Sequence, residues 1–188
     1  MRARADSYIE PKKGKQHKAD RQWNTKAHLF LSYKLWLPLA RVTAVYLSNA
    51  ALGSIWIQCR PRDGSLDTAK AICAYLNSSV GLYSILAGRD NRKPSYPQFS
   101  LDTLRSIPVP NLSAHVDARD TLARVFGHLR DEVLLPLPQM DHDPIRRRLD
   151  DAVTEALDLD PEWVATIRRE LSREPSITNR RYAGLDDW

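Results

Sequence analysis

Residues 67–87 combine helical spacing of apolar side chains with small polar residues in the middle of the stretch. The apolar positions predict a largely buried helix. They are Ala71, Ala74, Tyr75, Val80, Leu82, Ile85 and Leu86. The sequence Asn77-Ser78-Ser79 and Gly81 interrupt this pattern, and glycine inside a helix costs about 1 kcal/mol relative to alanine. Either another backbone approaches closely at this point, or the helix kinks or breaks between Leu76 and Leu82.

The segments on both sides of this helix predict the fold class. Strand-forming residues are concentrated in 41–59, on either side of a break at 49–53, and a further strand is expected within 28–39. After the helix, a short helix should start at Ser100, and longer helices should span 115–135, 144–157 and 161–173. The sequence therefore predicts an α+β fold, in which a small β-rich body packs on a buried helix and a helical segment follows.

Charge divides the chain into unequal parts. Residues 1–112 contain 17 Lys+Arg and 7 Asp+Glu, whereas residues 113–188 contain 11 and 16. We expect a basic arm or truncated lead-in at 1–27, an α/β body at 28–112 and a helical tail at 113–188. A basic body indicates a polyanionic partner, usually nucleic acid. The acidic balance of the tail argues against DNA contact there and favours a packing or partner surface.

Several classes of protein are excluded by composition and motifs. An apolar content of 43% excludes a fully disordered chain, and neither a membrane span nor a signal peptide is recognisable. We therefore expect a cytoplasmic protein whose two cysteines, Cys59 and Cys73, are reduced and buried. Nucleotide-binding glycine loops, zinc motifs and a nucleophile elbow are absent from the sequence. The acidic residues at 141–143 precede a helix start, where they favour the helix dipole. The residues themselves thus predict no catalytic and no metal-binding site.

The strongest binding signal is the loop at 89–99, where basic and aromatic residues alternate. Lys and Arg neutralise phosphates, and Arg and Gln also match base edges in the major groove. Tyr96 could stack on an unpaired base or fill the core, and both interpretations remain open. The candidate DNA contacts in the loop are Arg89, Arg92, Lys93, Tyr96 and Gln98. The candidates for phosphate contact elsewhere are Arg60, Arg62, Lys12, Lys13 and Lys15.

Three short motifs follow one another in the chain: LNSSVG at 76–81, YPQFS at 96–100 at the end of the basic loop, and LRSIPVP at 104–110. In this order they resemble the C-terminal part of bacterial N6-adenine DNA methyltransferases, including the TaqI-like enzymes and fused type II restriction–modification enzymes. The resemblance covers roughly residues 23–178. It implies that Leu76, Asn77, Ser78 and Gly81 form a structural motif. In that motif the Asn77 amide would tie the helix to a neighbouring strand, and Gly81 would allow close packing.

In the family that this chain resembles, this region recognises the DNA target beside a separate methyltransferase domain. The family's N/D-P-P-Y/F tetrapeptide and its glycine-rich S-adenosylmethionine loop are both absent from the sequence. Flipping and methylating an adenine requires both pockets. The resemblance thus implies a double-stranded DNA-binding target-recognition module, or a C-terminal fragment, of a bacterial restriction–modification system for phage defence. It would not be an enzyme by itself, and S-adenosylmethionine would be bound by a separate catalytic subunit.

Two other hypotheses stay open. The chain could be a protein–protein interaction subunit that docks a separate methyltransferase or nuclease through its helical tail. It could also be a nonfunctional remnant of a longer gene, which would expose apolar patches and aggregate.

Overall fold

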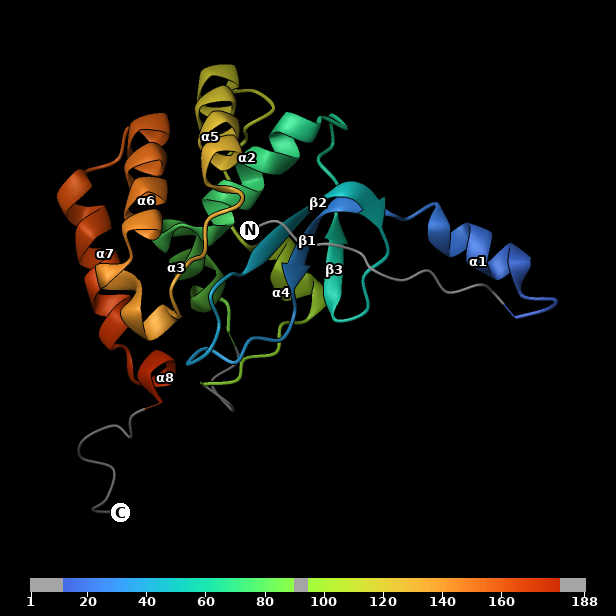
Figure 1. The fold of residues 1–188 in the computed structure, drawn as a ribbon, viewed down its shortest axis with the longest axis horizontal. Helices are drawn as coiled ribbons and strands as arrows, with labels where there is room; N and C mark the ends of the chain where they lie inside the picture. Colours follow the sequence, from blue (N-terminus) through green and yellow to red (C-terminus); the bar gives the residue numbers. More distant parts are fainter. Residues whose placement is uncertain (1–11, 90–94, 180–188) are drawn as a thin grey trace, which may run out of the picture.

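The computed structural model of the protein describes residues 12–89 and 95–179. Within these residues a small antiparallel sheet is formed by β1 (Ala27–Ser32), β2 (Ala44–Ala51) and β3 (Trp56–Cys59), in the order β2-β1-β3 (Figure 1). The central strand β1 is buried at five of its six positions. The sheet and the helices that follow it confirm the expected α+β class.

Helices α5, α6 and α7 lie to one side of the sheet, and α1 projects on the opposite side (Figure 1). Helix α2 packs on β1 and β2, α5 packs on α2, and α6 and α7 continue the helical layer outward. The helices are α1 (Gln16–Trp23), α2 (Leu66–Asn77), α3 (Ser79–Ala87), α4 (Leu101–Ser106), α5 (Val116–Leu129), α6 (Pro144–Leu157), α7 (Pro161–Arg173) and α8 (Pro175–Thr178), with a 3₁₀ helix η1 at Leu137–His142.

Helices α6 and α7 occupy the residues that the sequence predicted. Each has proline in its first turn, where a missing N–H costs nothing. Each also has an aspartate N-cap, Asp143 for α6 and Asp160 for α7, whose carboxylate accepts hydrogen bonds from first-turn N–H groups. The segment between α5 and α6 contains η1, which the sequence pattern did not indicate.

One open alternative is confirmed and other expectations are corrected. The stretch 67–87 does break between Leu76 and Leu82, because Ser78 has extended backbone angles between α2 and α3. The helix expected at 115–135 is shorter, since α5 ends at Leu129. The expected strand break at 49–53 begins later, since β2 continues to Ala51, which pairs with Ala27 past a bulge in the register. The expected basic arm contains α1, whose Gln16 amide donates to the Asp20 carboxylate one turn on (2.8 Å) and whose residues, all described, are unburied.

The predicted body and helical tail share one hydrophobic core. Leu29 of β1, Leu82 of α3, Leu122 of α5, Leu149 of α6 and Val164 of α7 belong to the same buried cluster. The change of charge balance near residue 112 therefore affects only the surface of the molecule. The hydrophobic core continues from the residues before it to the residues after it.

Candidate nucleic-acid interface

The Asn77 side chain joins α2 to the sheet, as its motif suggested. Its Oδ1 accepts a hydrogen bond from the Thr43 N–H (2.9 Å). Its Nδ2 donates to the carbonyl of Ala44 (2.8 Å), the first residue of β2, and to the carbonyl of Cys73 (2.9 Å). The side chain is fully buried. A buried amide with both of its groups paired in this way has a structural role.

The other residues of the motif build the break between α2 and α3. The Ser78 hydroxyl donates to the Tyr75 carbonyl at the end of α2 (2.6 Å) and accepts from the Gly81 N–H at the start of α3 (3.1 Å). The Leu76 carbonyl accepts from the Thr43 hydroxyl (2.5 Å). A Cβ on Gly81 would lie 2.1 Å from the Tyr75 carbonyl oxygen, so only glycine allows this close approach.

Buried charged side chains form hydrogen bonds with the backbone groups that have no helical partner at the break between α2 and α3. Asp150 of α6 accepts from the Ser79 N–H and from the Ser79 hydroxyl, both at 2.7 Å, and from Arg168 of α7 at 2.8 Å. Arg146 donates to the Asn77 carbonyl and to the Arg41 carbonyl (2.7 Å). Burial raises the pKa of Asp150 and lowers that of Arg146. These charges hold elements together and are enclosed by protein.

Arg89, predicted to contact DNA, lies in an ion pair within the protein. Its guanidinium donates to Glu174 Oε1 (2.7 Å) and to the Ser176 hydroxyl (3.0 Å), and its side chain is only 16% exposed. Arg89 thus links the end of α3 to the segment that carries α8. Arg92 and Lys93 lie outside the described residues.

The two arginines of the turn after β3 differ in their surroundings. The Arg60 side chain donates to the carbonyls of Lys26 (2.9 Å from Nε) and Asn24, so it fixes the segment between α1 and β1. Arg62 is exposed. Arg60 and Arg62 keep cationic groups on the sheet side of the molecule, as a phosphate contact would require.

Tyr96 and Gln98 lie on a two-stranded ribbon that the sequence did not reveal. Residues 33–37 run antiparallel to residues 95–99. The Leu35 N–H donates to the Pro97 carbonyl (3.2 Å), the Leu37 N–H to the Ser95 carbonyl (3.0 Å) and the Phe99 N–H to the Tyr33 carbonyl (2.9 Å). Lys34 and Gln98 form a bridge between these bonded positions.

This register sets Lys34 opposite Gln98 and Trp36 opposite Tyr96. Both are non-hydrogen-bonded pairs, in which side chains approach most closely. Alternate residues of the ribbon face the core: Leu35, Leu37 and Phe99 are buried, as is Pro97. We call the opposite set, Lys34, Trp36, Tyr96 and Gln98, the ribbon face.

The ribbon face is open to solvent. Trp36 is 55% exposed and Tyr96 is 46% exposed, so Phe99 fills the core and Tyr96 does not. Lys34 is half-buried, with its Nζ 5.2 Å from the centre of the Tyr33 ring. The sequence predicted Tyr96 and Gln98 as site residues but not Lys34 and Trp36. The signal for Lys34 and Gln98 is that each is a polar residue directly followed by a buried apolar one, Leu35 and Phe99.

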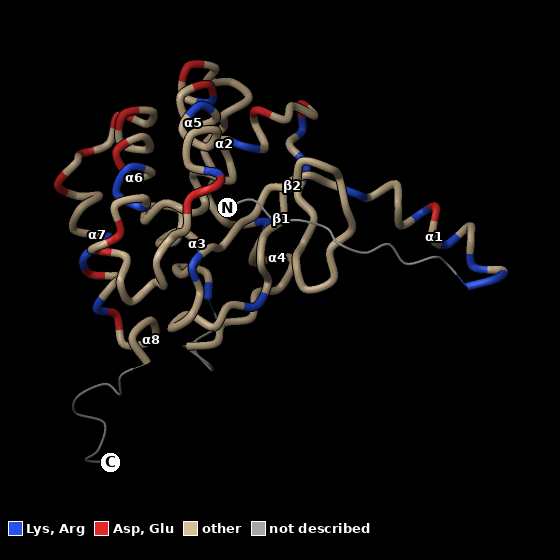
Figure 2. Tube along the Cα trace, viewed as in Figure 1, with Lys and Arg blue, Asp and Glu red and all other residues tan. Residues whose placement is uncertain are grey.

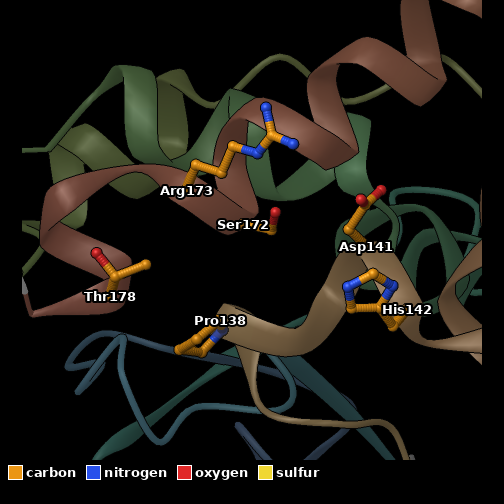
Figure 3. Close-up of a pocket in the computed structure, with 6 residues that line it drawn as sticks. All are labelled: Pro138, Asp141, His142, Ser172, Arg173 and Thr178. Carbon is orange, nitrogen blue, oxygen red and sulfur yellow. The ribbon is translucent and has the colours of Figure 1, made fainter.

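A polar cavity in the helical tail has a different composition. A cavity of about 370 Å³ lies between η1 and the end of α7, and none of the predicted site residues lines it. Figure 3 shows its walls, which are Pro138, Asp141, His142, Ser172, Arg173 and Thr178. Asp141 lies 3.7 Å from the Nε of Arg168, so its carboxylate already faces a cation. Across residues 12–89 and 95–179, no three His, Cys, Asp or Glu side chains are grouped to hold a metal ion.

The cysteines take no part in this interface. Cys73 is fully buried, and burial raises its pKa to about 12. Burial also raises the pKa of Cys59. Both thiols therefore stay protonated at neutral pH. The expectation of burial holds for Cys73 but not for Cys59, which is only partly buried.

Comparison of the chain with protein-family models, curated proteins and solved structures finds no match. Over the part of the chain that the structure describes, no helix is long and apolar enough to cross a membrane.

Proposed function

We propose that this chain is a DNA-binding target-recognition module that works with a separate catalytic polypeptide of a bacterial adenine methyltransferase or restriction–modification system. The ribbon face is the observation that carries the proposal. It brings a cation, an amide and two aromatic rings from distant parts of the sequence onto one solvent-facing surface. A two-stranded ribbon fits the major groove of B-DNA, where a glutamine amide can pair with adenine.

Charge supports the same orientation of the molecule toward DNA. Residues 12–26 contain a single acidic residue, Asp20. They also carry several exposed cations, which lie within α1 and on both sides of it (Figure 2). These cations are Lys12, Lys13, Lys15, Lys18, Arg21 and Lys26. Residues 113–179 contain instead 14 Asp and Glu against 9 Arg, and the two kinds are mixed along α5, α6 and α7 (Figure 2). A polyanion would therefore meet α1 and the sheet side, with the helical layer turned away.

The chemistry of methyl transfer belongs, in this proposal, to the partner polypeptide. The sequence carries neither the adenine-binding tetrapeptide nor the glycine-rich cofactor loop of the family it resembles. The partner would bind S-adenosylmethionine and the flipped base. This chain would place both on the correct DNA site in the bacterial cytoplasm.

The test is a titration of the purified chain with a random-sequence 20-base-pair duplex at two salt concentrations. We compare wild type with Lys34→Ala/Gln98→Ala and with Arg148→Ala, an exposed arginine on α6. Loss of one phosphate contact should reduce the slope of log K against log salt by about 0.9. The ribbon variant should bind more weakly with a smaller slope, and Arg148→Ala should match wild type. Binding too weak to detect at low salt would contradict the proposal.

A second candidate function is supported by a groove in the helical tail. A groove of about 710 Å³ runs between the start of α5 and the end of α6. Small and apolar side chains such as Ala118, Ala156 and Leu157 line it together with Asp117 and Asp158. A groove that combines apolar side chains with carboxylates suits a basic amphipathic segment of a protein partner. This groove favours the hypothesis of a subunit that docks a methyltransferase or nuclease.

The two functions are separable by mutation. Val116 is 48% exposed at the edge of this groove, so Val116→Glu should leave the fold intact. If the tail docks a catalytic subunit, this variant should lose co-purification with the methyltransferase or nuclease encoded beside it and keep its DNA affinity. Unchanged co-purification would contradict docking through the groove.

A further inference from the structure

We infer that Trp36 and Tyr96 form a platform on which an unpaired base stacks, so that the preferred ligand is DNA with at least one base outside the duplex stack. This inference rests on the proposed function and specifies which form of DNA the chain prefers. It starts from the register of the ribbon, which sets the two rings on opposite strands in a non-hydrogen-bonded pair. In such pairs the Cβ atoms lie about 4.5–5.5 Å apart.

The ribbon holds this pair in place before any ligand binds. The Leu37 N–H and the Leu35 N–H donate across the ribbon on either side of Trp36. Phe99 is buried beneath it with 3% of its surface exposed. Because the backbone is tied on one face and packed on the other, the two exposed rings lose little freedom when a base stacks on them.

The surroundings of the pair match a single nucleotide. Lys34 and Gln98 occupy the next outward-facing positions, and diagonal neighbours on such a ribbon lie about 7–8 Å apart. A base on the rings would bring its phosphate toward the ammonium group of Lys34 and its edge toward the amide of Gln98. In an intact duplex the base faces are covered by neighbouring pairs, so the rings would have nothing to stack on.

Trp23 and Trp163, the other exposed tryptophans within residues 12–89 and 95–179, lack these features. Trp163 is 45% exposed but lies in the first turn of α7, directly after Glu162 and three residues after the acidic N-cap Asp160, where a nucleic acid would be repelled. Trp23 is 44% exposed, with Lys26 Nζ 5.1 Å from the centre of its ring. Trp36 therefore has a matched control in Trp163, which has similar exposure and the opposite electrostatic surroundings.

The experiment measures binding to three fluorescein-labelled DNAs: a 20-base-pair duplex, the same duplex with a five-nucleotide bulge, and a 20-nucleotide single strand. Trp36→Ala, Tyr96→Ala, Trp36→Phe and Trp163→Ala are compared with wild type. We expect wild type to bind the bulged duplex at least fivefold more tightly than the perfect duplex. Trp36→Ala and Tyr96→Ala should each weaken binding to the bulged duplex by about 5- to 150-fold, the equivalent of one lost base–aromatic stack.

Binding to the perfect duplex should change less than twofold in both alanine variants. Trp36→Phe should retain most of the preference, and Trp163→Ala should match wild type. Equal wild-type affinity for the perfect and bulged duplexes would overturn the stacking platform and leave the proposed function standing. Absence of salt-dependent binding to all three DNAs would overturn both. Urea unfolding of each variant confirms that the exposed substitutions leave the fold intact.

Discussion

Asn77 and Gly81 each have a surrounding that no other residue type matches. The Asn77 amide accepts from the Thr43 N–H and donates to the Ala44 carbonyl. An aspartate would lose the donors, and a leucine would leave both backbone groups unpaired in the core. Gly81 is required for a different reason, which is the lack of space between its Cα and the Tyr75 carbonyl.

Gly81→Ala should lower the free energy of unfolding by about 2–3 kcal/mol, because the added methyl group meets backbone that cannot rotate away. Gly127 in α5 is the matched control, since a Cβ there meets no atom within 4 Å. Gly127→Ala should raise stability by up to about 1 kcal/mol through helix propensity. Urea denaturation followed by circular dichroism measures both. Similar shifts for the two variants would show that the close approach at Gly81 is not required.

The structural motif at 76–81 is predictable from the sequence and the ribbon is not, because the two strands of the ribbon are far apart in the chain. The polar residues at 77–81 stand out within an apolar helix, so a local pattern reveals them. Whether Tyr96 faces solvent depends on its pairing with residues 33–37, some sixty positions earlier, and no local pattern contains that register. The same holds for Arg89. Its partner Glu174 lies far away in the sequence, so no local pattern shows that Arg89 is paired within the protein and not free to contact DNA.

At the scale of helices and strands, the break between α2 and α3 determines how the tail attaches. A helix end inside a core leaves N–H and carbonyl groups that need partners. Here Arg146 and Asp150 of α6 supply them, and the Asp150 carboxylate lies at the positive end of the α3 dipole. Arg168 of α7 completes the pairing of Asp150. The hydrogen bonds and ion pair at the break between α2 and α3 thus help to fix the positions of α6 and α7.

Asp150→Asn should lower stability by about 3–5 kcal/mol, because it removes the negative charge from a site where Arg168 and Arg146 stay buried. Asp151→Asn is the control, since Asp151 is the next residue and is exposed; it should change stability by less than about 0.5 kcal/mol. Chemical denaturation of the two variants measures the difference. A loss below about 1 kcal/mol for Asp150→Asn would contradict a supporting role for this charge.

The attachment of α8 should depend on pH through Glu174. Partial burial raises the pKa of its carboxyl, but hydrogen bonds from Ser176 and Arg89 outweigh burial and leave the pKa below its ordinary value of 4.5. A lowered pKa means that the stabilisation is complete above pH 4.5 and is lost as the pH falls through the folded-state value. Glu174→Gln should therefore lower Tm at pH 7 and match wild type near pH 2–3.

Thermal unfolding from pH 2 to pH 8 measures this dependence. Glu170→Gln serves as the control, because the Glu170 side chain is 62% exposed, and its Tm should follow wild type throughout. A difference between Glu174→Gln and wild type that persists unchanged into acid would contradict the role of the ionised carboxylate.

At the scale of the whole molecule, surface charge and packing follow different boundaries. Residues 12–62 contain ten basic residues and one acidic residue, whereas residues 113–179 contain more acidic than basic residues, mixed along the helices (Figure 2). One cluster of buried side chains nevertheless runs from β1 to α8. The sequence predicts the charge boundary directly, because every residue contributes to it independently. It does not predict the continuous core, which depends on how the apolar faces of α5, α6 and α7 are brought against α2 and α3.

A chain that ends at residue 142 should therefore fail to fold, although it retains the whole predicted recognition body. It would lose α6 and α7, whose core residues are Leu149, Val153, Val164, Ile167 and Leu171, together with the partners of the α2–α3 break. A chain that starts at residue 24 is the matched control, because the residues of α1, all within the described part, are unburied. It should unfold within about 0.5 kcal/mol of the full chain while losing salt-dependent DNA affinity.

Amide NMR spectra and urea denaturation distinguish these outcomes. The shortened C-terminal variant should give poorly dispersed amide signals and no cooperative transition, and the N-terminal variant should give both as in the full chain. A cooperative transition in the chain that ends at residue 142 would mean that the recognition body holds its own core. In that case the helical tail would be free to act as a separate docking element, and the interaction-subunit hypothesis would gain over a single module in which the tail holds the DNA-facing ribbon in shape.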